Sequence, residues 1–177
     1  MKILALDQAS KTTGYAIFEN SKLIDYGSFT VQDKVIPKRL VKIRNRVNEL
    51  IDKHNIDKVI LEDIQMQETV NGRKASSVDE INNVQTFKIL AEVLGVIVEL
   101  LEEKSIPYDI VLSNKWKSFL QIKGTIRDEQ KRNAKLYVKE TFNIDVIQDT
   151  CDAICIGMYA LGIPRATKEV DEFDWSE

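Results

Sequence analysis

The chain is poor in the residue types on which several classes of site depend. Among its 177 residues there is one histidine, His54, and there are two cysteines, Cys151 and Cys155. The chain therefore lacks the residues for a histidine-based nucleophilic triad or a zinc site. The cysteines are four residues apart in an apolar stretch, too close in sequence for a useful disulfide. We expect both to be reduced core residues.

Long apolar runs and targeting signals are also missing. No window has the apolar length of a membrane span, and the N-terminus lacks the charged, apolar and small-residue pattern of a secretory signal. With 44% hydrophobic residues, the chain can bury a sizeable core in one domain. We expect a soluble cytoplasmic protein whose domain spans residues 1–164, followed by an acidic tail, residues 165–177, that has too little apolar surface to fold alone.

Charge is distributed unevenly along the chain. The formal net charge is −3, but residues 169–177 hold five acids and no base, so removing them leaves +2 for residues 1–168. Residues 34–46 contain six bases and no acid, and residues 115–139 contain eight bases and two acids. A solvated helix face explains one such run, whereas two runs suit a polyanionic partner such as nucleic acid.

Apolar periodicity predicts an α/β fold. Three antiparallel strands are predicted first, at residues 2–6, 14–18 and 23–29. A helix from Pro37 to about His54 then leads to a strand at residues 59–61, and this crossover makes that strand parallel to the first. A long helix over residues 78–103 and a fifth strand over residues 108–112 follow. The predicted architecture is a mixed five-stranded sheet with helices on both faces.

Three further helices are predicted in the last third of the chain. The first is short, with Ser113 as its cap and Trp116 in the core. The second is basic and covers residues 126–142, and the third covers residues 148–161 with small and apolar residues at core spacing.

Four acids fall where this topology brings distant segments together. Asp7 ends the first strand and Glu62 ends the fourth, and the carboxyl ends of neighbouring parallel strands form the functional crevice of open α/β sheets. Asp149 and Asp152 share one face of the last helix. Four carboxylates without His or Cys form an oxygen-only site that suits Mg²⁺ or Mn²⁺. Two such ions about 4 Å apart can activate a water and stabilise the leaving oxygen of a phosphodiester.

Each acid also has a purely structural interpretation. Asp149 can be the N-terminal dipole partner of its helix, and Glu62 with Asp63 can be an ordinary strand exit. Asp152, flanked by Cys151 and Ala153 in an apolar helix, is harder to explain in this way.

The segments LALDQASKTTGYAIF, VILEDIQ and QDTCDAICIG carry a family resemblance. They resemble the RuvC-like Holliday-junction resolvases of the ribonuclease-H-like superfamily, especially the shorter phage versions, over nearly the whole chain. The resemblance implies a ribonuclease-H-like fold and a metal-dependent endonuclease, with two Mg²⁺ ions, that nicks Holliday junctions and related branched DNA in recombination and repair. It assigns the catalytic metal ligands to Asp7, Glu62, Asp149 and Asp152. A phage origin would place the protein in the bacterial host cytoplasm.

The resemblance also implies a lysine near the scissile phosphate. The family carries it in a glycine-containing segment before the last two helices, which here has Gly124 but no G-x-G spacing. Lys131 is the first candidate for stabilising the transition state, followed by Lys123 and Arg127. A solvated basic helix accounts for any single one of them equally well.

Further DNA contacts are expected in two polar segments. Ser10 and Thr12, in a tight turn with Thr13 and Gly14, can approach a phosphate, although turn formation alone also explains them. The polar stretch of residues 65–77 resembles the loop with which resolvases probe opened base pairs. Its candidate DNA-binding residues are Gln65, Arg73 and Lys74.

The predicted long helix has more apolar surface than one sheet contact uses. We therefore expect a homodimer through residues 78–103, with two symmetric sites that cut opposing strands. A non-cleaving module that binds branched DNA or a partner protein through this helix is the main alternative. An ATPase of the actin and sugar-kinase type would need a second domain and a second glycine-rich phosphate loop. The four acids do not distinguish DNA from RNA.

Overall fold

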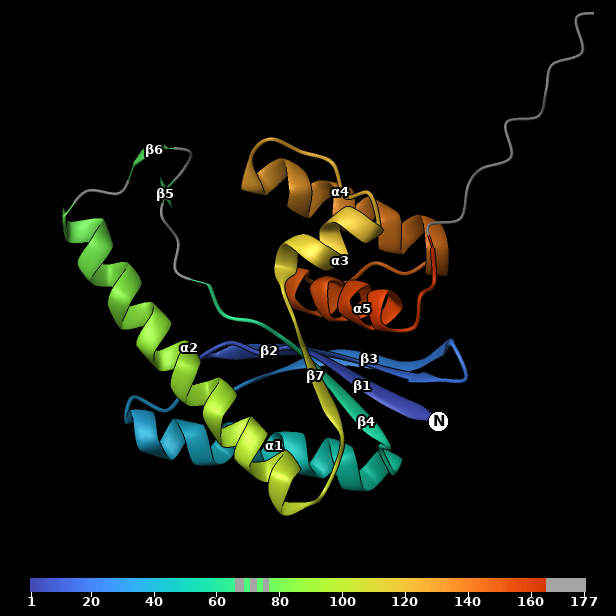
Figure 1. Ribbon diagram of the computed structural model, residues 1–177, viewed down its shortest axis with the longest axis horizontal. Coiled ribbons are helices and arrows are strands. Elements are labelled where there is room, and N and C mark those ends of the chain that lie inside the picture. Colours follow the sequence, from blue (N-terminus) through green and yellow to red (C-terminus); the bar gives the residue numbers. More distant parts are fainter. Residues whose placement is uncertain (66–68, 71–72, 75–76, 165–177) are drawn as a thin grey trace, which may run out of the picture.

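A five-stranded mixed sheet forms the centre of the protein (Figure 1). The computed structural model describes residues 1–65, 69–70, 73–74 and 77–164. The strands of this sheet are β1 (Lys2–Asp7), β2 (Thr12–Glu19), β3 (Lys22–Thr30), β4 (Lys58–Glu62) and β7 (Tyr108–Val111). Their order is β3-β2-β1-β4-β7; the first three are antiparallel, and β4 and β7 run parallel to β1. The predicted sheet is confirmed.

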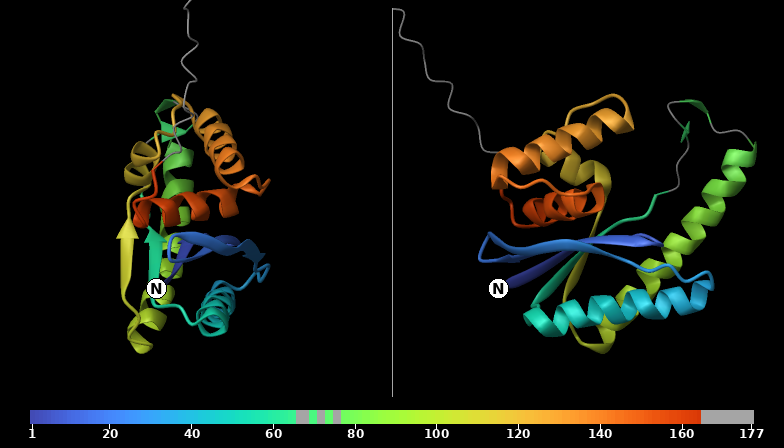
Figure 2. Two further views of the ribbon diagram at one scale, coloured as in Figure 1. Left: turned by 90° about the vertical axis from the view of Figure 1, so that its right-hand side faces the viewer. Right: turned by 180° about the vertical axis from the view of Figure 1, so that it is seen from behind.

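Helices cover both faces of this sheet, as predicted (Figure 2). On one face lie α1 (Ile36–His54) and α2 (Ser77–Glu103), which pack on each other. On the other face α5 (Gln148–Ala160) lies directly on β1 and β2, and α3 (Ser113–Phe119) and α4 (Arg127–Phe142) pack on α5. The N-terminal half of α2 projects away from the sheet in Figure 1.

Alternation along β1 divides the core into two layers. Ile3 and Ala5 belong to the cluster beneath α5, whereas Leu4 and Leu6 belong to the cluster beneath α1 and α2. All four side chains are buried, because a strand with helices on both faces buries successive residues on opposite sides. The continuous apolar run at the start of the sequence follows from this position.

Two glycines let α5 lie very close to β1 and β2. A Cβ atom on Gly157 would overlap the ring of Phe18, and one on Gly14 would overlap the backbone carbonyl of Asp149. Gly14 is paired with Asp7 in the antiparallel ladder between β1 and β2. The start of α5 is therefore pressed against the end of β1.

Local details differ from the sequence-based expectations in three places. Ser113 is the first residue of α3, not its cap, and Leu112 at the N-cap position makes no side-chain capping bond. Thr12 to Gly14 belong to β2 and not to a turn, because the threonines continue the pairing with β3 and the hydroxyls of Thr12 and Thr30 lie 3.0 Å apart. The polar stretch also contains two short antiparallel strands, β5 (Thr69–Val70) and β6 (Arg73–Lys74), too short to show an alternating pattern.

The cysteine prediction is confirmed. Cys151 and Cys155 are both buried and free. Among the helices in the described part of the chain, none has the combination of length and hydropathy that crossing a membrane requires.

The close contact at Gly157 predicts a strong packing effect. Gly157→Ala should lower the free energy of unfolding by about 1–3 kcal/mol, because the added methyl group overlaps the buried Phe18 ring. Denaturant unfolding measures this change. Ala160→Ser, at the exposed end of the same helix, should change the free energy by less than about 0.5 kcal/mol. Equal stability of the two variants would contradict the contact.

Candidate active site

Two acids stand side by side at the carboxyl ends of adjacent parallel strands. Asp7 is the last residue of β1 and Glu62 is the last residue of β4. The ladder pairs Leu6 with Leu61, so the next residue on each strand lies at the same level. Side chains two residues apart on a strand lie on the same face of the sheet. Asp7 therefore shares a face with Ala5, and Glu62 shares a face with Ile60, and this is the face covered by α5. Both carboxylates therefore belong to the edge and the face where α5 begins.

The side chain of Gln8 ties these two strand ends together. Its Nε2 donates to the backbone carbonyl of Glu62, and the backbone N–H of Glu62 donates to its Oε1 at 3.2 Å. This amide takes the place of a backbone partner just beyond the β1–β4 ladder. Gln8 is buried, and its two hydrogen bonds hold the spacing between the two acid-bearing strand ends.

The first turns of α5 add two further acids to this edge. Glu62, Asp152 and Asp149 all raise the pKa of Asp7, after burial, which is the largest cause and brings that pKa well above its usual value. The four predicted acids thus interact electrostatically around Asp7. The sheet supplies two of them and α5 the other two.

Burial and repulsion also act on Glu62 and Asp152. Burial is the largest cause of the raised pKa of Asp152, which lies at about 6. Glu62 and Asp149 also raise it, and a hydrogen bond from Gln148 Nε2 to its Oδ1 at 2.8 Å opposes the rise. Burial is also the main cause of the raised pKa of Glu62. Negative charge gathered here is unfavourable without a compensating cation.

Helix α3 supplies two site residues that the sequence analysis missed. The indole Nε1 of buried Trp116 donates to Oε1 of Glu62 at 2.9 Å. Lys117 lowers the pKa values of Asp7, Glu62 and Asp152, and its ammonium lies 5.1 Å from the centre of the Trp116 ring. Trp116 was predicted as core only, and Lys117 was counted only as part of a basic run. Their position just after β7, beside β4, is the signal that could have found them.

The three predicted cations lie in or just before α4. Arg127 is the first residue of this helix, and its charge lowers the pKa of Glu62. Lys131 follows one helical turn later and is partly buried. Lys123 is exposed in the preceding loop, where its backbone carbonyl accepts a hydrogen bond from Asn133 Nδ2 at 2.6 Å. The structure therefore brings the charge of Arg127 within range of Glu62, while Lys131 continues along the same helix face.

Three of the remaining candidate DNA contacts, Ser10, Thr12 and Gln65, lie close in sequence to the acid-bearing strand ends. Ser10 lies in the loop between β1 and β2, and Thr12 begins β2, where its hydroxyl bonds to Thr30. Gln65 is exposed three residues beyond Glu62. For Arg73 and Lys74 the structure describes the backbone of β6, and their side chains lie outside the described part.

The donor chemistry of the acid cluster fits a hard divalent cation. All four acids offer carboxylate oxygens, and their burial and repulsion would be relieved by positive charge. In the described residues, no three His, Cys, Asp or Glu side chains are arranged to hold a metal ion. Oδ1 of Asp152 is bonded to Gln148 and Oε1 of Glu62 to Trp116. Shared coordination would therefore require the acidic side chains to rotate toward one another.

Comparison with known families identifies the fold and the lineage. Residues 3–159 match the model of the family described as "Crossover junction endodeoxyribonuclease RuvC". The chain belongs to this family. The RuvC protein of Aliarcobacter butzleri is 30% identical over 96 residues, which are 52% of this chain and 61% of that relative. This chain therefore matches less than two thirds of the length of that RuvC relative.

Solved structures share the RuvC fold. Thermus thermophilus RuvC in complex with a Holliday junction substrate has a TM-score of 0.67 and 12% identity, with 92% of this chain and 93% of that chain covered. Fowlpox virus resolvase with Holliday junction DNA has a TM-score of 0.56 and 14% identity, with 91% and 97% covered. The predicted ribonuclease-H-like architecture of RuvC resolvases is confirmed.

The raised pKa of Asp152 predicts a pH-dependent stability of the metal-free protein. Between its usual 3.8 and about 6, the folded chain binds this proton more tightly than the unfolded chain. The contribution of this proton to the free energy of unfolding is fully present below pH 4 and is lost as the pH rises through 6. Asp152→Asn should remove this loss, worth about 2–3 kcal/mol at pH 7 relative to pH 4.

Urea unfolding in a chelator at a series of pH values tests this expectation. The matched control is Asp145→Asn, because Asp145 is exposed in the loop between α4 and α5 and pairs with Lys139. The control should keep the pH slope of the original chain. If Asp152→Asn also kept that slope, Asp152 would not carry the raised pKa.

Proposed function

We propose that this chain is a metal-dependent endonuclease that hydrolyses phosphodiester bonds in branched DNA, such as Holliday junctions and related forks. The observation that carries this proposal is the acid cluster, in which Glu62, Asp152 and Asp149 act on Asp7 next to the cation of Lys117. Membership of the RuvC family supports branched DNA as the substrate. Residues 1–164 would form the nuclease domain, and the acidic segment 165–177 lies outside the described residues.

Asp7, Glu62, Asp149 and Asp152 are proposed to hold two Mg²⁺ ions, which Mn²⁺ can replace. When bound, such ions supply the Lewis acidity that activates a water and stabilises charge on the leaving oxygen of a phosphodiester. The chain itself orients the ligands: Gln8 spaces the strand ends, and Trp116 holds one oxygen of Glu62. No side chain needs to attack the phosphate, so cleavage would proceed without a covalent enzyme intermediate.

Cations beside the acids would stabilise the negative charge that grows on the phosphate in the transition state. Lys117 is the first candidate for this role, because its charge acts on three of the acids. Arg127 follows, through its effect on Glu62. Lys131, one turn along α4, is proposed to extend this positive charge toward the DNA. Ser10, Thr12, Gln65, Arg73, Lys74 and Lys123 remain proposed DNA contacts.

A homodimer is proposed through the free part of α2. Ile81 and Val84 are 60% and 52% exposed on this helix. Gly95 is exposed in its interior, with nothing within 4 Å of an added Cβ. A glycine inside a helix costs about 1 kcal/mol relative to alanine, and it allows the backbone of a second helix to approach closely. Two sites related by two-fold symmetry would then cut opposing strands.

Removal of single acids provides the test of the nuclease proposal. Asp7→Asn, Glu62→Gln and Asp152→Asn should each slow nicking of a labelled four-way junction at least about 100-fold, the scale expected when a key transition-state interaction is lost. Junction binding should be retained or tightened, because a negative charge near the phosphate is gone. A digestion series on four-way, three-way and linear DNA, with Mg²⁺, Mn²⁺ or chelator, measures both effects.

The exposed Asp145 again provides the control, and Asp145→Asn should nick normally. If the unaltered protein bound the junction but never nicked it with either metal, the alternative of a non-cleaving DNA-binding module would replace the nuclease. Full activity in any of the three acid variants would contradict its place in the site.

The exposed glycine of α2 gives a clean test of the dimer. Gly95→Arg should leave the protomer folded, since the added side chain meets open space, but should convert the dimer to a monomer. Light scattering after size-exclusion chromatography measures the mass. Leu136→Arg, at an exposed position of α4, should remain dimeric. A monomeric unaltered protein, or a dimeric Gly95→Arg variant, would exclude this interface.

A further inference from the structure

The basic run of residues 34–46 has no role in the proposed active site. It forms the segment after β3 and the first half of α1. Three of its bases, Lys38, Lys42 and Arg46, are four residues apart and therefore share one side of the helix. Lys38 is exposed, and the side chains of Lys42 and Arg46 are 58% and 55% exposed. At 1.5 Å per residue, this α1 ridge of three bases is about 12 Å long.

The α1 ridge is connected directly to the loop that follows Asp7. Arg39 donates from Nη1 to the carbonyl of Ser10 at 3.2 Å and from Nε to the carbonyl of Asp33 at 2.8 Å. The backbone N–H of Val31 donates to the carbonyl of Lys11 at 2.8 Å. Lys11 is four residues from Asp7, so their Cα atoms are within about 14 Å. Bases therefore begin near the acid cluster and continue along α1.

This surface keeps a clear positive excess after its acids are counted. Its six bases are Lys11, Lys34, Lys38, Arg39, Lys42 and Arg46. Arg44 is not counted, because it pairs with Glu99 and Glu103 of α2. Two acids face them, Asp33 bonded to Lys42 and Glu49 bonded to Arg46. Six bases less two acids leave +4. Arg39 contributes fully to this excess, because its described hydrogen bonds go to backbone carbonyls.

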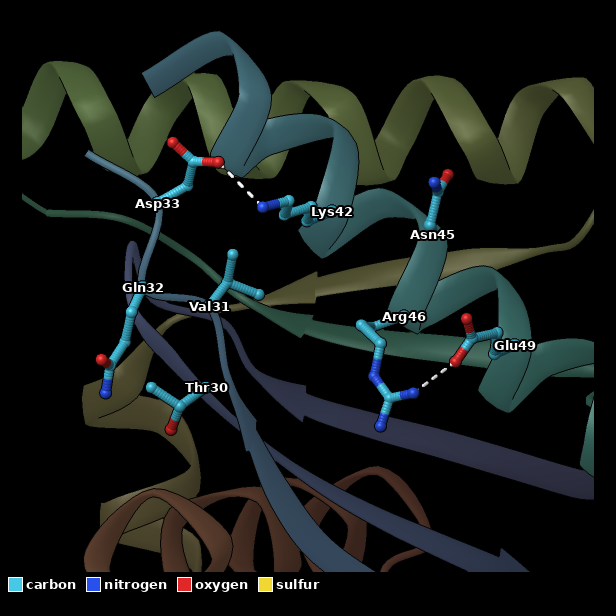
Figure 3. Close-up of a pocket in the computed structure, with 8 residues that line it drawn as sticks. All are labelled: Thr30, Val31, Gln32, Asp33, Lys42, Asn45, Arg46 and Glu49. Carbon is cyan, nitrogen blue, oxygen red and sulfur yellow. Dashed lines mark hydrogen bonds and ion pairs between the residues drawn. The ribbon is translucent and has the colours of Figure 1, made fainter. Parts of the chain in front are cut away.

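A hollow of about 530 Å³ lies along the ridge, between the end of β3 and α1 (Figure 3). Its lining combines two ion pairs, Lys42 with Asp33 and Arg46 with Glu49, with the neutral polar side chains of Thr30, Gln32 and Asn45. Apart from Val31, which is buried, every lining side chain is charged or polar. The hollow therefore offers hydrogen-bonding groups in place of an apolar anchor, and the net positive charge of this surface comes from its other bases.

We propose that the α1 ridge and this hollow bind the phosphate backbone of one duplex arm of a branched DNA, leading away from the cutting site. The inference depends on the proposed function for its substrate. At about 3.4 Å per base pair, the ridge spans three to four phosphates of one strand. Duplex suits the surface better than a single strand, because the ring of Phe29 is buried beneath Arg46 and cannot stack on bases. The contacts are with phosphates, so they position an arm without reading its sequence.

The test neutralises two ridge positions in the full chain. Lys38→Gln with Lys42→Gln is compared with Lys22→Gln with Lys53→Gln, which removes the same charge from the far end of β3 and of α1. The two pairs match, since Lys53 is exposed and paired with Asp25 as Lys42 is paired with Asp33. Fluorescence anisotropy of labelled four-way junctions is followed over a range of KCl concentrations without divalent ions.

The ridge variant should bind a long-armed junction about 10-fold more weakly at low salt, and its salt slope should fall by about 1–2, near 0.9 per lost phosphate contact. The control pair should match the unaltered chain. On a junction with arms too short to reach α1, the two variants should bind alike. Lys38→Arg with Lys42→Arg should restore the slope, which excludes misfolding as the cause.

Equal affinities and slopes for the ridge and control variants on long arms would overturn the proposal. So would unchanged junction binding accompanied by loss of binding to polyglutamate, which would assign the ridge to an acidic protein segment. Because binding is measured without cleavage, the outcome is separate from that of the nuclease proposal. If the chain never nicks DNA but shows the slope change, the ridge proposal stands and the nuclease proposal fails. The reverse result supports the nuclease proposal alone.

Discussion

Negative charge gathered at one edge of the sheet is the main electrostatic constraint in this RuvC-family chain. Burial and mutual repulsion raise the pKa values of Asp7, Glu62 and Asp152. The backbone imposes this arrangement, because the acids sit at strand ends and on a helix that cannot move apart without breaking the core. Trp116 and Lys117 offset part of the unfavourable charge. Such a site favours the binding of cations, and bound cations would stabilise the folded state relative to the unfolded state.

Close packing of α5 on the sheet is what brings the two halves of this acid cluster together. Gly14 and Gly157 leave room for backbone where a methyl group would overlap neighbouring atoms. Gln8 fixes the spacing between the ends of β1 and β4 through its hydrogen bonds to the backbone of Glu62. Two glycines and one glutamine therefore determine the geometry of a site whose reactive groups are carboxylates. Substitutions at these positions would alter the site without changing any of its charges.

Positive charge surrounds the acids on separate elements. Lys117 belongs to α3, Arg127 begins α4, and the α1 ridge approaches from the other face of the sheet through the loop after Asp7. A polyanion that reaches the acids would therefore meet cations on several sides. These cations lie near the acids although the net charge of the chain is −3. This distribution also fits the proposed branched substrate, whose arms would leave the acid cluster in different directions.

Local sequence patterns were sufficient for the strands of the main sheet, for the five helices and for the placement of the acids. Alternation and helical spacing predicted every strand of the main sheet, the crossover rule made β1 and β4 parallel neighbours, and the i, i+3 spacing placed Asp149 and Asp152 on one face. Only the tertiary structure decided that Trp116 bonds to Glu62, 54 residues away, that the charge of Lys117 acts on Asp7, Glu62 and Asp152, and that Gln8 joins the strand ends. The reason is physical: periodicity reports which face of an element is buried, whereas contacts between side chains on different elements depend on how those elements pack.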